Sequence, residues 1–180
     1  MKTVLILTGS PRKGGNTDML AAAFARGAEA AGHKVLHFNA SAENIRGCVA
    51  CNKCFSTGKA CVFDDGFNKL APLLAEADVL VLATPLYWFS FSAQIKAAFD
   101  KLYAFIVGGR PLHIRETVLL ACAAGTEEHG FDGLIKSHEL IASYMEWKNR
   151  GCLSVPGVSE KGDILKTDAL ERAEEMGRRL

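Results

Sequence analysis

Short apolar runs recur along the chain and alternate with longer segments in which apolar and polar residues follow a helical spacing. Three of the runs are continuous rather than alternating. Continuous runs rich in Val, Ile and Leu are typical of strands that are buried on both faces of a parallel sheet. The runs predict five β-strands, at Thr3–Leu7, Lys34–Phe38, Val79–Thr84, Thr117–Ala121 and Gly151–Val155.

The segments between the strands predict helices. The first is rich in Ala and Leu and stops before Gly32, a residue type that commonly terminates helices. Asp64 and Asp65 precede the second helix and can cap it. The third carries apolar residues three and four positions apart, as on one face of a helix. The five predicted helices are Thr17–Ala31, Phe67–Glu76, Ser92–Ile106, Phe131–Lys148 and Asp163–Leu180.

The order of these elements predicts an α/β fold. Strict alternation of strands and helices requires right-handed crossovers and a parallel sheet that helices cover on both faces. Five strands in 180 residues match a single doubly wound, flavodoxin-like architecture with the strand order 2-1-3-4-5. We expect one domain over residues 1–180, with a cysteine-rich loop at residues 44–63 inserted after the second strand.

Charge and hydropathy exclude several classes of partner. A net charge of +1 argues against a large electrostatic footprint for nucleic acid or an anionic membrane. No stretch reaches the roughly 18 apolar residues that a membrane-spanning helix needs. The short apolar run at the N-terminus lacks a small-residue cleavage site, so we expect a cytoplasmic protein.

The loop from Thr8 to Thr17 joins the first predicted strand to the first predicted helix. In a doubly wound fold this loop lies where ligands bind. Gly9 and Gly14 let backbone N–H groups approach an anion, and the start of the helix adds a favourable partial charge. The expected phosphate-binding residues are Ser10, Arg12, Gly15, Asn16 and Thr17.

Two familiar nucleotide loops do not fit this segment. The spacing of Gly9 and Gly14 suits a P-loop, but Gly15 and Asn16 stand where Lys and Ser/Thr are required. A G-x-G-x-x-G pattern is absent, so a dinucleotide lying across this turn is not expected. The simplest alternative is a surface loop in which Asn16 or Thr17 only caps the helix.

The segment Gly9–Arg12, with the sequence GSPR, is followed by Gly15–Thr17, with the sequence GNT. This pattern resembles the FMN phosphate loop of the NADPH-dependent FMN reductase and iron–sulfur flavoprotein group. The resemblance extends through most of the chain in motif order and spacing. It implies a flavodoxin-like protein with FMN as cofactor and NAD(P)H as electron donor.

The resemblance implies an FMN oxidoreductase that passes electrons to a flavin, a quinone or a similar small-molecule or protein acceptor. The flavin N5 then carries the chemistry, so no catalytic side chain is expected. No G-x-S-x-G or H-E-x-x-H motif is present. The alternatives are an electron carrier without turnover of its own and an FMN-binding module with a regulatory thiol loop.

Two further loops follow the third and fourth strands, where the fold again places ligands. The first is rich in aromatic residues, whose faces can stack on a flat ring. The resemblance implies ring contacts from Pro85, Leu86, Tyr87 and Trp88. The alternative is that aromatic residues here fill the core or a dimer interface, which we expect of Phe89 and Phe91.

In the loop after the fourth strand, Gly125 and Thr126 are expected at the pyrimidine edge of the flavin, and His129 is expected to face solvent. In the resembled family the helix that begins at Ser92 often lines the subunit interface. A homodimer or homotetramer is therefore expected.

Four cysteines crowd into the irregular loop with the spacing C-x2-C-x2-C-x6-C: Cys48, Cys51, Cys54 and Cys61. This spacing suits a 4Fe-4S cluster better than zinc, whose sites usually use two separated pairs. The resembled iron–sulfur flavoproteins carry a compact motif of this form. Zinc, free thiols and a C-x-x-C redox switch remain the alternatives. Cys122 and Cys152 lie in predicted strands and are expected as small buried apolar residues.

Overall fold

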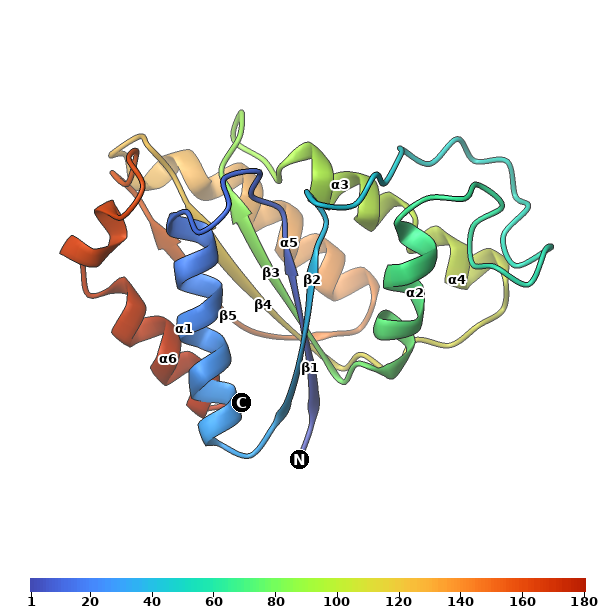
Figure 1. The fold of residues 1–180 in the computed structure, drawn as a ribbon, viewed down its shortest axis with the longest axis horizontal. Coiled ribbons are helices and arrows are strands. Elements are labelled where there is room, and N and C mark those ends of the chain that lie inside the picture. The colour runs from blue at the N-terminus through green and yellow to red at the C-terminus, as the bar shows by residue number, and fades with distance from the viewer.

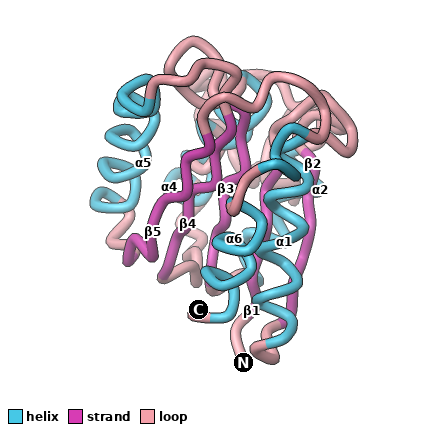
Figure 2. Tube along the Cα trace, turned by 90° about the vertical axis from the view of Figure 1, so that its left-hand side faces the viewer, coloured by secondary structure: helices cyan, strands magenta, loops and turns pink.

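The computed structural model describes residues 1–180 and contains a five-stranded, all-parallel sheet (Figure 1). The strand order is β2-β1-β3-β4-β5, which confirms the predicted flavodoxin-like α/β architecture. The strands are β1 Thr3–Thr8, β2 Lys34–Asn39, β3 Val79–Pro85, β4 Glu116–Cys122 and β5 Lys148–Val155. Loops gather at the carboxyl ends of the strands, at the top of Figure 2.

Helices cover both faces of the sheet. The helices α1 and α6 pack on one face, and α2, α3, α4 and α5 lie on the other (Figure 1). The α-helices are α1 Asn16–Ala30, α2 Phe67–Glu76, α3 Ala93–Asp100, α4 Tyr103–Val107, α5 Asp132–Tyr144 and α6 Ala169–Arg178, with 3-10 turns at Glu128–Phe131 and Asp163–Lys166.

Alternate residues of the central strands supply two separate cores. In β1, Leu5 and Leu7 face the helices α2 to α5, whereas Val4 and Ile6 face α1 and α6. All four side chains are almost completely buried. Burial on both faces explains why the first run is continuously apolar.

The helices α1 and α6 cross with their backbones in contact. A Cβ atom at Gly27 would lie 1.8 Å from the carbonyl oxygen of Glu174, and one at Gly177 would lie 2.2 Å from that of Phe24. Only glycine fits at either position. The carboxyl-terminal helix is therefore held tightly against the first helix.

The third predicted helix, Ser92–Ile106, is interrupted in the structure. Between α3 and α4, the N–H groups of Lys101 and Leu102 each bond to the carbonyl three residues earlier. The side chain of Lys101 is buried against Asp65, far away in the sequence. This tertiary contact overrides the local helical pattern.

The last two predicted helices are shorter than expected. The chain leaves α5 at Tyr144, and a left-handed conformation at Glu146 redirects it, so β5 already begins at Lys148. At the carboxyl end, the extended conformation of Thr167 separates a 3-10 turn from α6.

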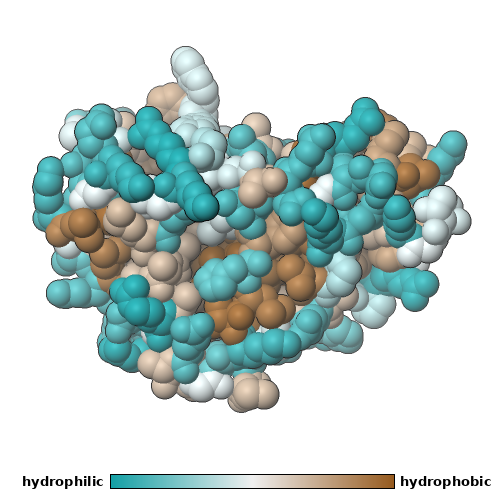
Figure 3. Space-filling model, in the orientation of Figure 1, coloured by the Kyte–Doolittle hydropathy of each residue, from teal (hydrophilic) through white to brown (hydrophobic).

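On the face seen in Figure 3, apolar side chains gather over the edge strand β2, and polar side chains surround them. No helix has the length and apolar character needed to cross a membrane.

His138 on α5 provides a pH-dependent term in the stability. Its ring is 1% exposed, with Nε2 3.1 Å from the hydroxyl of Thr117 and Nδ1 without a partner. Burial lowers the pKa of His138 from 6.5 to about 4, although Glu139 opposes the shift. The unfolded chain therefore binds the proton more readily, and stability is lost as the pH falls from about 6.5 towards 4.

We predict that His138→Gln removes this dependence. Between pH 7.5 and 4.5 the wild type should lose roughly 2 to 3 kcal/mol more unfolding free energy than the variant. Urea unfolding at the two pH values measures the difference. The exposed His37, replaced by Gln, is the control and should behave as the wild type. Equal losses in all three proteins would contradict the assignment.

Candidate cofactor site

The amino end of α1 lies at the carboxyl edge of the sheet and has no side-chain cap (Figure 1). The backbone N–H groups of Asn16 and Thr17 have no acceptor in the protein. Just before them, the N–H of Gly15 donates to the carbonyl of Arg12 at 2.9 Å, and Gly14 adopts a φ of 65°. Unpaired N–H groups and the positive end of the helix dipole make this turn suitable for an anion.

The side chain of Asn16 has a different task from the one expected. Its Nδ2 donates to the carbonyls of Val158 at 3.2 Å and Glu160 at 2.8 Å. Its Oδ1 accepts from the N–H groups of Gly162 at 2.9 Å and Ile164 at 3.4 Å. The amide is thus used to fix the segment 158–164 beside the phosphate loop. Asn16 can offer a phosphate its backbone N–H.

Two basic side chains, Arg12 and Lys161, lie beside the loop that precedes α1, and Asp18 in the first turn of α1 accepts the N–H of Gly14 at 2.8 Å. Arg12 donates from Nη1 to the carbonyl of Ser159 at 2.8 Å, and its backbone N–H donates to the hydroxyl of Ser10 at 3.2 Å. Lys161 reaches back to the carbonyl of Lys13 at 3.3 Å. Sequence analysis missed Lys161 and Ser159. The rule that carboxyl ends of parallel strands share one edge could have found them, because both follow β5.

Thr17 and Cys122 lie beneath this loop, and both are buried. Burial raises the pKa of the Cys122 thiol to about 12, although a hydrogen bond with the Thr17 side chain opposes this. The thiol therefore stays protonated at neutral pH and behaves as a small apolar group, as predicted. Cys152 is only half-buried, and burial raises its pKa to about 11.

Most of the predicted cofactor residues line one cavity of about 220 Å³. Its predicted members are Ser10, Arg12, Gly15, Asn16, Thr17, Pro85, Leu86 and Tyr87. Residues that sequence analysis did not select complete the wall: Cys122, Ala123, Ala124, Val158 and Ser159. The loops after β1, β3, β4 and β5 therefore meet here.

The loop after β3 forms a tight turn that projects above the sheet (Figures 1 and 3). Tyr87 and Ser90 exchange backbone hydrogen bonds of 3.1 and 3.0 Å. Between them, Trp88 and Phe89 adopt φ values of 48° and 63°, and their side chains are 93% and 63% exposed. Left-handed conformations are costly for bulky residues and are commonest at functional sites.

This aromatic turn borders a second cavity of about 420 Å³. Leu86, Ala123 and Ala124 line both cavities, so the two adjoin and are together called the hollow. Trp88 and Gly125 line the second part. Thr126 lines neither part and is the one predicted ring-contact residue that the structure does not bring there.

Of the two aromatic residues that were expected to fill the core or an interface, one is buried and the other is exposed. Phe91 is buried and stacks on Phe99 with ring centroids 6.0 Å apart, as predicted for a core residue. Phe89 is exposed, so it does not fill the core of this chain. His129 lines the second cavity from an exposed position.

The cysteine loop lies away from this hollow, at the right of Figure 1. Its four cysteines line one cavity of only about 20 Å³, which has room for little more than a water molecule. Cys48 and Cys51 are exposed, whereas Cys54 and Cys61 are half-buried. No three Cys, His, Asp or Glu side chains are arranged to hold a metal ion. The expected 4Fe-4S ligand set is therefore not assembled, and the loop in this conformation does not fit a cluster.

A buried ion pair anchors the cysteine loop. Lys101 and Asp65 are 3% and 5% exposed, and Lys101 Nζ lies 3.5 Å from Cys61 Sγ. Asp65 also accepts the backbone N–H groups of Arg46 at 3.2 Å and Phe67 at 3.0 Å. Asp65 thus meets the start of α2, as expected, but it also fixes the loop to the end of α3.

The thiols of the loop influence one another. Burial raises the pKa of Cys54, and the neighbouring thiols Cys51, Cys61 and Cys48 raise it further. Cys54 is therefore a poorer nucleophile than an isolated thiol at neutral pH.

A flavodoxin-like sheet, with free N–H groups at its first turn beside a hollow, is suited to a flat, phosphorylated cofactor. The sequence model of NADPH-dependent FMN reductases matches residues 1–155, and the chain belongs to this family. An FMN-dependent oxidoreductase is the class that this family defines.

Curated relatives include iron–sulfur flavoproteins of archaea. One from Archaeoglobus fulgidus is 36% identical over 111 residues, covering 62% of this chain and 49% of that protein. One from Methanosarcina thermophila is 27% identical over 166 residues, covering 92% and 83%. The chain thus spans about half the length of the first relative.

Solved structures share the fold. An NAD(P)H:quinone oxidoreductase from Methanothermobacter marburgensis superimposes with a TM-score of 0.77 at 23% identity, covering 99% of this chain and 95% of that one. An FMN-dependent NADH-azoreductase from Bacillus anthracis, in complex with FMN, gives 0.70 at 12% identity, covering 98% of both chains.

Proposed function

We propose that the hollow binds FMN and that the protein uses it to move electrons from NAD(P)H to a quinone, a flavin or a similar acceptor. The observation that carries this proposal is the uncapped start of α1, whose free N–H groups open into the narrow part of the hollow. The proposed FMN contacts are Ser10, Arg12, Gly15, Asn16, Thr17, Pro85, Leu86, Tyr87, Trp88 and Gly125.

In this arrangement the phosphate lies in the narrow, cationic part of the hollow and the ring lies in the wider part. Bound FMN supplies the hydride and electron chemistry. The protein holds the phosphate through N–H groups and Arg12, and it closes one side with apolar residues such as Leu86 and Ala123. Cys122 stays protonated and does not act as a base. The exposed Trp88 turn borders the side open to donor and acceptor.

The phosphate assignment predicts a specific loss of FMN affinity. Arg12→Ala should raise the dissociation constant of FMN about tenfold, because it removes a charged donor from the phosphate. Quenching of flavin fluorescence during titration of the apoprotein measures this constant. Arg26→Ala removes the same charge from the exposed surface of α1 and is the control. Equal affinities in both variants would reject the assignment.

Turnover tests the enzymatic role. Anaerobic protein with bound FMN should oxidise NADPH or NADH in repeated cycles when ferricyanide or a quinone is present. A spectrophotometric assay at 340 nm follows the oxidation, and free FMN at the same concentration is the control. Protein that binds FMN but oxidises neither nucleotide faster than the control would be a carrier or a binding module.

A second candidate is an electron carrier with FMN and a 4Fe-4S cluster. The spacing of the four cysteines and the iron–sulfur flavoproteins among the relatives favour it. Cluster binding requires the loop to rearrange, because Cys48 and Cys51 are exposed. This candidate expects brown protein with about four irons per chain after anaerobic purification. Iron-free protein with titratable loop thiols would reject it.

We also propose a homodimer through the outer face of α3, α4 and α5. Exposed apolar side chains line a cavity of about 430 Å³ there, among them Tyr103, Ile106, Leu140 and Tyr144. Exposed apolar surface of this kind marks an interaction site. Light scattering should give the mass of a dimer for the wild type and that of a monomer for Ile106→Glu. A dimeric variant would place the interface elsewhere.

A further inference from the structure

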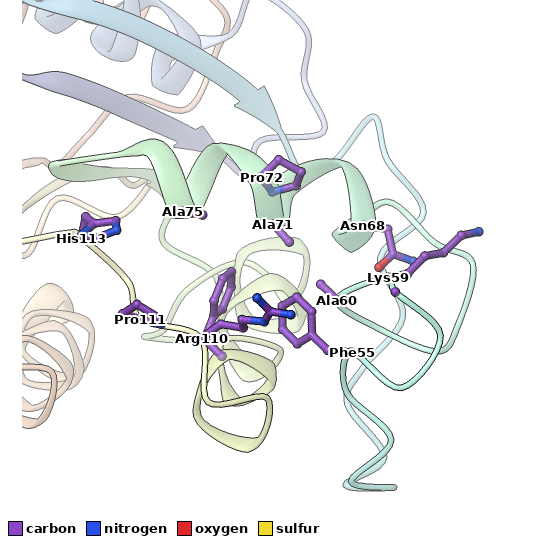
Figure 4. Close-up of a pocket in the computed structure, with 12 residues that line it drawn as sticks. Phe55, Lys59, Ala60, Asn68, Ala71, Pro72, Ala75, Arg110, Pro111 and His113 are labelled. Atoms are coloured by element: carbon purple, nitrogen blue, oxygen red, sulfur yellow. The ribbon is translucent and has the colours of Figure 1, made fainter.

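A cavity of about 580 Å³ lies behind the cysteine loop (Figure 4). Three segments that are distant in the sequence form it: the cysteine loop, one face of α2, and the chain that follows α4. It shares no residue with the cofactor hollow. Its volume is within the range of pockets that hold small organic molecules.

The walls of this cavity are largely apolar. Ala71, Pro72 and Ala75 line it from α2, and Phe55 lines it from the cysteine loop (Figure 4). Phe105 of α4 lines it as well. The two phenylalanine rings meet edge to face with centroids 5.9 Å apart. A flat hydrocarbon body can therefore lie between α2 and these rings.

The side chain of Phe55 is tightly packed in the wall of the cavity. Phe55 adopts a φ of 57°, which is unfavourable for a bulky residue. Its ring packs directly on Gly108, where an added Cβ would lie 2.4 Å from Phe55 Cδ2. Close packing holds the ring in place despite the cost of its backbone conformation.

The charged residues of the cavity are all basic. These are Lys59 and Arg110, and no Asp or Glu lines the cavity. Lys59 pairs with Asp64 in solvent, at 2.8 Å. The side chain of Arg110 makes no hydrogen bond and no ion pair, and its guanidinium carbon lies 5.5 Å from the centroid of the Phe55 ring. Its donors are therefore free for an incoming anion.

We propose that this cavity is a binding site for a small organic carboxylate with a flat apolar body. The carboxylate binds the guanidinium of Arg110, whose planar fork matches it. The apolar body fills the space between α2 and the two phenylalanine rings. Because Phe55 directly follows Cys54, an occupant of this site also restrains the cysteine loop.

Calorimetric titration with 1-naphthoate and with the neutral 1-naphthamide tests the site. Excess FMN is present throughout, to occupy the cofactor hollow. If FMN does not bind, the Arg110→Gln variant still distinguishes this cavity from the hollow, because Arg110 lines this cavity alone. The wild type should bind one naphthoate per chain, at least about tenfold more tightly than the amide. Arg110→Gln should weaken naphthoate binding about tenfold and leave the amide unchanged.

Two further variants complete the test. Arg172→Gln removes an exposed charge from α6 and should bind as the wild type does. Ala75→Leu fills the cavity and should weaken binding of both compounds. The proposal is overturned by equal affinities for naphthoate and the amide, by unchanged binding in Arg110→Gln, or by absence of binding at millimolar concentration.

Discussion

The unsatisfied N–H groups at the start of α1 are the constraint on which the proposed site depends. Buried or half-buried N–H groups need an acceptor, and no side chain of this protein supplies one to Asn16 or Thr17. Because β1 lies between β2 and β3, this turn stands at the carboxyl edge beside the loop that follows β3, and the loop that follows β4 comes next. A phosphate placed there satisfies the helix, and the rest of its molecule then extends along those loops.

Much of this arrangement could be predicted because it rests on patterns within short segments. Continuous apolar runs such as Val79–Thr84 identify strands with two buried faces, and alternation with helices then fixes a parallel sheet. Once the strand order is set, the loops after β1 and β3 must converge. The glycines and polar residues of the first loop therefore predict an anion site at this edge, where most of the predicted residues line one cavity.

The remaining features depend on contacts between distant residues. Lys101 has the sequence context of an ordinary helical lysine, and only its burial against Asp65 explains why the helix breaks there. The side chain of Asn16 donates hydrogen bonds to carbonyls more than 140 positions away. The residues next to Asn16 in the sequence therefore give no sign of this structural role. The spacing of the four cysteines indicates ligands, but the spacing alone cannot show whether the loop brings the sulfur atoms together.

The close crossing of α1 and α6 links the carboxyl-terminal part of the chain to the proposed cofactor site. The segment 158–164 connects β5 to α6, and hydrogen bonds from the Asn16 side chain fix it beside the loop that precedes α1. This segment and α6 lie beyond residue 155, where the family match ends. In the proposed site, retention of FMN therefore depends on the docking of α6, a helix that does not line the hollow. A chain shortened at its carboxyl end, or fused there to a bulky tag, would lose the outer wall of its phosphate site.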